Sequence, residues 1–153
     1  MKFFFFLFFT AVSLFADAHI LLYHRFDDNK PKLQHMNISS KLFSEQIAFL
    51  KENGYKFVPL SQLVADIKAQ KPIADKTICI TIDDAYKSFY KSGFPILKNE
   101  KIPFTMYVYV QAVNEHYPDY MSWDELKEIS HYGSVELHSY AHKDLTKLSS
   151  AAL

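Results

Sequence analysis

The feature that most constrains the fold of this chain is its alternation of short apolar runs with stretches of helical period. The apolar runs are rich in β-branched and aromatic residues, and the stretches between them place apolar residues three or four positions apart. Strands that alternate with helices pair in parallel, so we predict an α/β fold built from βα units. The predicted strands span 19–23, 55–58, 77–82, 105–110 and 134–137.

Capping and breaking residues set the limits of the predicted helices. Ser39 or Ser40 is suited to cap a first helix that Gly54 ends, and Ser61 to cap a second helix that Pro72 ends. Two further helices are predicted at 94–99 and after a capping box formed by Ser122 and Glu125.

Residues 1–18 have the pattern of a secretory signal peptide. Lys2 supplies a positive charge, 3–15 form an apolar stretch, and Ala16-Asp17-Ala18 provides a small-residue cleavage site. We therefore expect an exported protein, periplasmic or extracellular, whose domain spans 19–153. An uncleaved anchor is the alternative, but the apolar stretch is shorter than the roughly 20 residues of a membrane-spanning helix. No transmembrane helix is expected after signal cleavage.

The charge balance argues against a nucleic-acid partner. Lys and Arg number 17 and Asp and Glu number 17, and no basic cluster interleaves with the aromatic residues. The single cysteine, Cys79, cannot form an internal disulfide, and we expect it to be buried within a strand. Serine or cysteine nucleophilic catalysis is disfavoured, since the chain also has no Gly-x-Ser-x-Gly motif.

Two short motifs that follow predicted strands carry a candidate metal site. Asp83 and Asp84 follow one strand, and His138 and His142 follow another. The active sites of α/β barrels are built at such strand ends. Asp84, His138 and His142 offer one oxygen and two nitrogens, which suits Zn²⁺ or a neighbouring divalent ion and leaves a position open for water. Asp83 is then available to take a proton from that water.

Each of these residues also has a structural interpretation. An Asp-Asp pair after a strand is most often a turn or a helix start, while His138 is alternatively a core or capping residue and His142 a solvated one. His24 and Arg25 follow the first predicted strand and point to the same end as the motifs. We predict that they contact substrate or support a ligand, and a buried, hydrogen-bonded His24 is an equal alternative.

The two motifs and three other segments carry a family resemblance. The stretch 80–86 (Ile-Thr-Ile-Asp-Asp-Ala-Tyr) resembles the first motif of the polysaccharide deacetylases, carbohydrate esterase family 4, and 138–142 (His-Ser-Tyr-Ala-His) resembles the second. The segments 22–26, 94–97 and 122–126 are also similar to segments of that family. The resemblance implies a distorted (β/α) barrel with parallel strands.

The resemblance also implies a role for each motif residue. Asp83 would be the general base, and Asp84, His138 and His142 would hold a divalent metal, usually zinc. The implied reaction removes N-acetyl groups from a polysaccharide that contains N-acetylglucosamine, and the segment 22–26 is similar to the subgroup acting on β-1,6-linked polymers. Aromatic residues that could stack on sugar rings, with a core position as the alternative, are Tyr107, Tyr109, Tyr117 and Trp123.

The chain departs from the family pattern at two positions and lacks its later motifs. Ala85 stands where the family usually has Gly, and Ile82 where Phe is common. A methyl group at Ala85 would crowd a backbone that either approaches the substrate closely or needs a positive φ. The motifs that supply an orienting Arg, an acetyl pocket and a proton-donating His would lie beyond Leu153. Residues 19–153 thus resemble the amino-terminal part of a catalytic domain and imply a partial barrel.

Such a partial barrel would expose a sheet edge and an unfilled interior. We expect it to bind metal but to turn over slowly or not at all, and to be either poorly stable alone or completed by a second polypeptide carrying the missing barrel units. Two alternatives remain open on the sequence. One is a catalytically inactive, carbohydrate-binding relic of the same fold, and the other is a metal-dependent hydrolase that cuts C–N bonds outside sugars.

Overall fold

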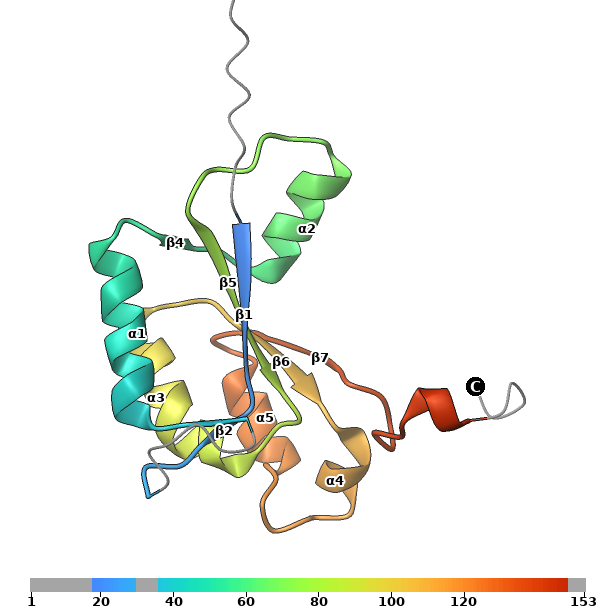
Figure 1. The fold of residues 1–153 in the computed structure, drawn as a ribbon. Helices are drawn as coiled ribbons and strands as arrows, with labels where there is room; N and C mark the ends of the chain where they lie inside the picture. The colour runs from blue at the N-terminus through green and yellow to red at the C-terminus, as the bar shows by residue number, and fades with distance from the viewer. Residues whose placement is uncertain (1–17, 30–35, 149–153) are drawn as a thin grey trace, which may run out of the picture.

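The strands that carry the two motifs belong to one parallel sheet. The computed structural model describes residues 18–29 and 36–148. Within them β1, β5, β6 and β7 lie side by side in that order, with the short β4 beside the start of β5 (Figure 1). All these pairings are parallel, which confirms the predicted α/β fold. The strands are Ala18–Tyr23 (β1), Lys56–Phe57 (β4), Thr77–Asp83 (β5), Thr105–Val108 (β6) and Ser134–Leu137 (β7), and a separate parallel pair is formed by Arg25–Phe26 (β2) and Asn37–Ile38 (β3).

The register of the sheet places the carboxyl ends of its parallel strands at one end of the sheet. Tyr23 of β1 lies beside Ile82 of β5, and Asp83 of β5 lies beside Tyr107 of β6. Tyr107 lies in turn beside Glu136 of β7. The segments that follow β1, β5 and β7 therefore emerge close together, and these segments carry both sequence motifs.

Helices α1, α3 and α5 supply most of the helical side chains in the hydrophobic core around the central strand. Ile78, Ile80 and Ile82 alternate along β5 and belong to the same buried cluster as side chains from α1, α3 and α5. Cys79 lies between two of these isoleucines and is buried, as predicted, and burial raises the pKa of its thiol. The helices span Ser40–Glu52 (α1), Phe94–Glu100 (α3) and Trp123–Ile129 (α5), and they contribute Phe43, Ile47, Phe94, Leu97, Leu126 and Ile129 to the core.

The helix α2 (Leu60–Lys68) lies near the amino end of β5 (Figure 1), and its limits differ from the prediction. It begins directly after Pro59 and not at a cap formed by Ser61, and it ends before Pro72 is reached. The carbonyl of Pro59 already accepts the N–H groups of Gln62 and Leu63, at 3.0 and 3.2 Å. Because proline also has its φ fixed in the helical range, the helix can start there without a side-chain cap.

The predicted strand 105–110 ends early, because its last residues enter a helix. The strand β6 stops at Val108, and the next helix, α4, spans Val110–Asn114. The N–H groups at the start of α4 donate to the carbonyls of Ser139 and Tyr140. These hydrogen bonds join segments far apart in the sequence, so the alternating pattern of the strand gave no sign of them.

The predicted signal peptide lies outside the described residues except for Ala18, which begins β1. The sequence also indicates that a loop over 145–148 enters a further helix at 149–153, and that helix lies outside the described residues. In the part of the chain that the structure describes, no helix has the length and apolar character needed to cross a bilayer.

The capping box at the start of α5 is formed as predicted. Ser122 Oγ accepts the N–H of Glu125 at 3.2 Å, and the Glu125 carboxylate accepts the N–H of Ser122 at 2.7 Å. We expect Ser122→Ala to lower the free energy of unfolding by about 1 kcal/mol in urea denaturation, because a helix N–H loses its acceptor. Ser130→Ala, at the other end of α5, is the control, and an equal loss in both variants would contradict the role of the cap.

Candidate metal centre

The first motif leaves β5 through a left-handed turn. Asp83 is the last residue of β5, and the next two residues, Asp84 and Ala85, have φ values of 71° and 62°. Neighbouring residues on an extended strand point to opposite faces, so this turn is what allows both aspartates to face the same region. Ala85 adopts the positive φ that glycine would adopt freely, and this conformation costs an L-residue about 1–2 kcal/mol.

The second motif is a strained loop that α4 holds in place. The N–H of His138 donates to the carbonyl of Val108 at 2.9 Å, which carries the loop forward from the end of β7. Ser139 and His142 have φ values of 62° and 47°, and Ser139 Oγ accepts the N–H of His142 at 3.0 Å. The N–H of Val110, at the start of α4, also donates to the carbonyl of Ser139. Held by these hydrogen bonds, the loop directs both imidazoles toward the end of β5.

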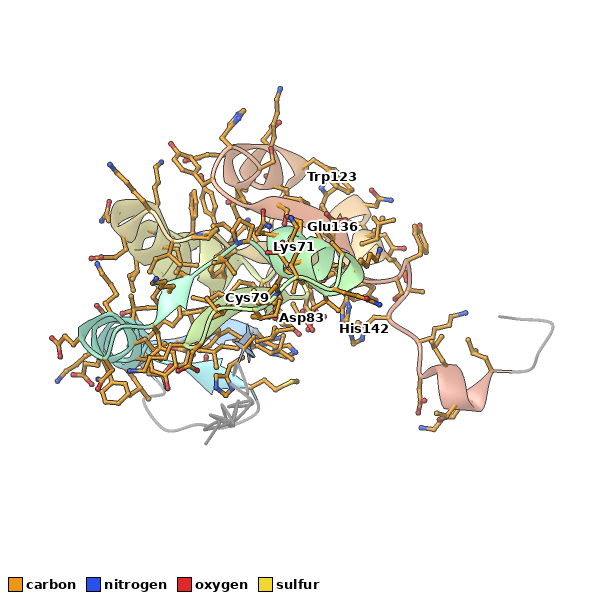
Figure 2. The ribbon with its side chains drawn as sticks, turned by 90° about the horizontal axis from the view of Figure 1, so that it is seen from above. Lys71, Cys79, Asp83, Trp123, Glu136 and His142 are labelled. Carbon is orange, nitrogen blue, oxygen red and sulfur yellow. The ribbon has the colours of Figure 1, made fainter. Side chains whose placement is uncertain are left out.

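Three side chains from the two motifs converge as a candidate metal-binding cluster. Asp84, His138 and His142 each offer one ligand atom, and these three atoms lie within 4.8 Å of one another. The two imidazole Nε2 atoms are 3.2 Å apart, and Asp84 Oδ1 lies 3.2 Å from that of His142 and 3.6 Å from that of His138. Figure 2 shows Asp83 and His142 at the same end of the molecule.

The chemistry of the cluster fits a divalent cation. Asp84 is 4% exposed, and its Oδ1 atom has no hydrogen-bond partner among the described residues although two imidazole nitrogens lie near it. A buried carboxylate oxygen without a partner is unfavourable unless a cation meets it. The side chains of His138 and His142 are 34% and 48% exposed, so the cluster is open on the side away from Asp84. One oxygen, two nitrogens and an open side are the features of a catalytic zinc site.

Asp83 lies beside the cluster without being part of it. Its Oδ2 atom is 3.7 Å from His138 Nε2 and 3.9 Å from His24 Nε2. Burial raises the pKa of Asp83, and the two nearby imidazoles act in the opposite direction. A half-buried carboxylate next to a cation site is well placed to exchange a proton with a water molecule there.

The two residues predicted to contact substrate lie in different surroundings. The His24 side chain is 15% exposed and faces Asp83. The Arg25 guanidinium lies over the ring of Tyr86, 3.8 Å from its centroid, and one of its nitrogens is 3.9 Å from Asp119. The structure therefore brings His24 to the cluster, whereas Arg25 packs against Tyr86, the last residue of the first motif.

A chain of aromatic rings, in which only Tyr120 was not singled out by the sequence, connects the two motifs. The Tyr86 ring lies 4.7 Å from that of Tyr120, the Tyr120 ring lies 5.7 Å from that of Tyr109, and Tyr109 lies 5.4 Å from the ring of His142. Tyr107, on β6, lies 6.3 Å from His138. The sequence offered a signal for Tyr107 and Tyr109 through the strand pattern, but none for Tyr120.

The fold and the site together define an α/β protein with a candidate divalent-metal centre at the carboxyl ends of its parallel strands. Comparison with known families identifies it further. The family model described as "Polysaccharide deacetylase" matches residues 70–153, which is more than half of the chain. The chain therefore belongs to the polysaccharide deacetylase family, as the motif resemblance implied.

Curated relatives of the chain are poly-β-1,6-N-acetyl-D-glucosamine N-deacetylases. The Staphylococcus aureus (strain MSSA476) protein is 32% identical over 127 residues, which cover 81% of this chain and 43% of that protein. The Escherichia coli (strain K12) protein is 29% identical over 133 residues, which cover 77% of this chain and 20% of that protein. The chain thus spans less than half of the length of either relative.

Solved structures of deacetylases share the fold. IcaB from Ammonifex degensii matches with a TM-score of 0.70 and 31% identity, over 88% of this chain and 57% of that one. The Streptococcus pyogenes deacetylase PplD, solved in complex with acetate, matches with a TM-score of 0.75 and 24% identity, over 85% of this chain and 59% of that one. The second likeness concerns the fold alone.

Proposed function

We propose that this chain carries the metal centre of an exported N-deacetylase acting on a polymer of N-acetylglucosamine, and that the polymer is β-1,6-linked. The observation that carries the proposal is the buried Asp84 oxygen facing two imidazole nitrogens beside a separate carboxylate. Family membership supports the reaction class. The names of the curated relatives support the polymer, and the leader pattern of residues 1–18 supports export.

In this proposal each residue of the site has a distinct task. Asp84, His138 and His142 hold a divalent ion, for which the mixed nitrogen and oxygen donors favour Zn²⁺. The ion supplies Lewis acidity for the acetyl carbonyl and lowers the pKa of water in the site. Asp83 accepts a proton from the water that attacks the carbonyl carbon, and His24 holds the Asp83 carboxylate in position. The C–N bond then breaks as the nitrogen takes up the proton that Asp83 accepted, giving acetate and a sugar amine.

Apolar side chains of the parallel sheet are exposed at both of its outer strands. On the edge strand β1, Ile20 and Leu22 are 53% and 54% exposed, and at the end of β7 Leu137 is 76% exposed. Apolar side chains on unpaired edge strands are unfavourable in water and invite pairing with a further strand. We propose that additional barrel strands, supplied by this polypeptide or by a second one, cover these side chains in the active protein.

Metal removal tests the proposed function directly. The zinc-loaded chain, as a partial barrel, is expected to release acetate slowly from β-1,6-linked N-acetylglucosamine oligomers, to lose this activity when a chelator removes the ion, and to regain it when Zn²⁺ is restored. Acetate release that is unaffected by the chelator would refute the metal centre. Stoichiometric zinc binding without acetate release would favour the non-catalytic carbohydrate-binding alternative.

A further inference from the structure

Tyrosine side chains continue outward from the metal centre along the α4 side. The residues Tyr109, Tyr117, Tyr120 and Tyr140 form what we call the tyrosine rim. Tyr109 contacts the ring of His142, Tyr120 lies 5.7 Å from Tyr109, and Tyr117 lies 6.1 Å from Tyr120. The rim is thus continuous with the candidate metal centre.

The outer members of the rim are presented to solvent. Tyr117 is 37% exposed and Tyr140, which lies near enough to Tyr117 to interact electrostatically with it, is 59% exposed, whereas Tyr109 and Tyr120 are half-buried. Tyr140 lies within the second motif, and its carbonyl accepts the N–H of Gln111 at 2.8 Å, which fixes the backbone that carries it. Exposed aromatic rings on a fixed backbone offer flat apolar faces at little cost in conformational entropy.

A fixed carboxylate lies next to these rings. Glu115 accepts hydrogen bonds from the Tyr117 hydroxyl and from the Gln111 side chain, both at 2.7 Å. These two hydrogen bonds lower the pKa of Glu115, so the carboxylate remains ionised at neutral pH. The rim therefore combines apolar ring faces with an oriented, charged acceptor of hydrogen bonds.

This combination matches the chemistry of a sugar ring. A pyranose presents one face of C–H groups, which packs on an aromatic ring, and a perimeter of hydroxyl groups, which donate to a carboxylate. A purely apolar partner would remove water from the charged Glu115 carboxylate and add no donor to the two that it has, Tyr117 and Gln111. We propose that Tyr117, Tyr140 and Glu115 form a subsite for a sugar unit of the polymer, next to the unit whose acetyl group reaches the metal centre. This subsite rests on the proposed function, because it gives that function's polymer its binding surface.

Direct binding tests the subsite without requiring turnover. The zinc-loaded chain is titrated with a β-1,6-linked N-acetylglucosamine pentamer by calorimetry and by fluorescence of Trp123, the single tryptophan. This reporter is close, since its indole N–H donates to Asn114 at the end of α4. We expect Tyr117→Ala and Tyr140→Ala each to weaken binding about fivefold to tenfold, and Tyr117→Phe to weaken it less.

The control separates the rim from exposed tyrosines in general. Tyr132 is 45% exposed and packs on Phe94, so Tyr132→Ala is expected to leave the pentamer affinity unchanged. Zinc affinity is measured for every variant and is expected to stay at the wild-type value, which shows that the fold and the metal centre are intact. Equal pentamer affinity in the wild type and both rim variants, or no saturable binding by the wild type, would overturn the subsite.

Failure of the subsite and failure of the proposed function give different results. Pentamer binding that depends on the rim but releases no acetate supports the subsite and refutes the deacetylase activity. Zinc-dependent hydrolysis of 4-nitrophenyl acetate without pentamer binding refutes the subsite and leaves the hydrolytic chemistry standing.

Discussion

Asp84→Asn should lower the affinity of the chain for Zn²⁺ by about 100-fold or more. Asp84 supplies the only oxygen of the three converging ligand atoms, and an amide carries no charge to offset that of the ion. Residues that merely support a zinc ligand are typically worth 10-fold to 100-fold in affinity, so loss of a ligand is expected to exceed that range. Calorimetric titration against a competing chelator measures the effect.

The stability of the same variant provides a second readout. In the metal-free chain the buried Asp84 carboxylate has the two imidazoles beside it, at 3.2 and 3.6 Å, and an uncharged amide costs less to bury, so the thermal midpoint should change little. With free Zn²⁺ at 100 times the wild-type dissociation constant, the wild type should gain about 2.7 kcal/mol and the variant almost nothing. Asp75→Asn, at an exposed turn, is the matched control and should retain the full gain. Wild-type zinc affinity in Asp84→Asn would exclude Asp84 as a ligand.

The sequence was sufficient to predict the parallel sheet, because β5 and its neighbours have residue patterns that are typical of strands. The run from Thr77 to Ile82 is β-branched and almost wholly buried, and the structure extends it by only one residue, Asp83. Parallel pairing then determines which strand ends meet. The convergence of the segments carrying Asp84 and His138 is therefore a consequence of topology, which the alternation of strands and helices already implied.

The remaining details depend on contacts between distant segments. The strand predicted to reach Val110 turns into α4 because a loop some thirty residues later accepts its N–H groups. Arg25 was predicted to lie at the same end as the motifs, and the cation–π contact of its guanidinium with the ring of Tyr86 depends on a residue some sixty positions later. No local periodicity encodes either contact, so sequence patterns alone could not have supplied them.

The backbone conformation of Ala85 was neither fully predicted from the sequence nor hidden from it. The family usually has glycine at this position, and the sequence left two explanations open, a close approach of the backbone to substrate or a positive φ. The structure shows φ at 62°, so the second explanation applies to this chain. The strain is confined to the turn that brings Asp84 beside Asp83, which makes it a condition of the site and not a defect of the fold.

Asp83→Asn should separate chemistry from metal binding. Asp83 is not one of the three converging residues, and its nearest oxygen lies 3.7 Å from His138 Nε2, so zinc affinity is expected to stay within a few-fold of the wild type. An asparagine cannot accept the proton of the attacking water, and loss of a positioned general base typically costs 10²-fold to 10⁴-fold in rate. Steady-state acetate release measures kcat, and zinc titration measures the occupancy of the site.

The contrast between the two aspartates is the sharper test of the assigned roles. If Asp84 is the ligand and Asp83 the base, excess Zn²⁺ should restore part of the activity of Asp84→Asn but none of that of Asp83→Asn, because only the first variant is limited by occupancy. His24→Gln should resemble a milder Asp83→Asn, since His24 contacts the Asp83 carboxylate at 3.9 Å and not the ligand cluster. Rescue of Asp83→Asn by added zinc would instead make Asp83 a ligand, and the proton acceptor would have to be sought elsewhere in the site.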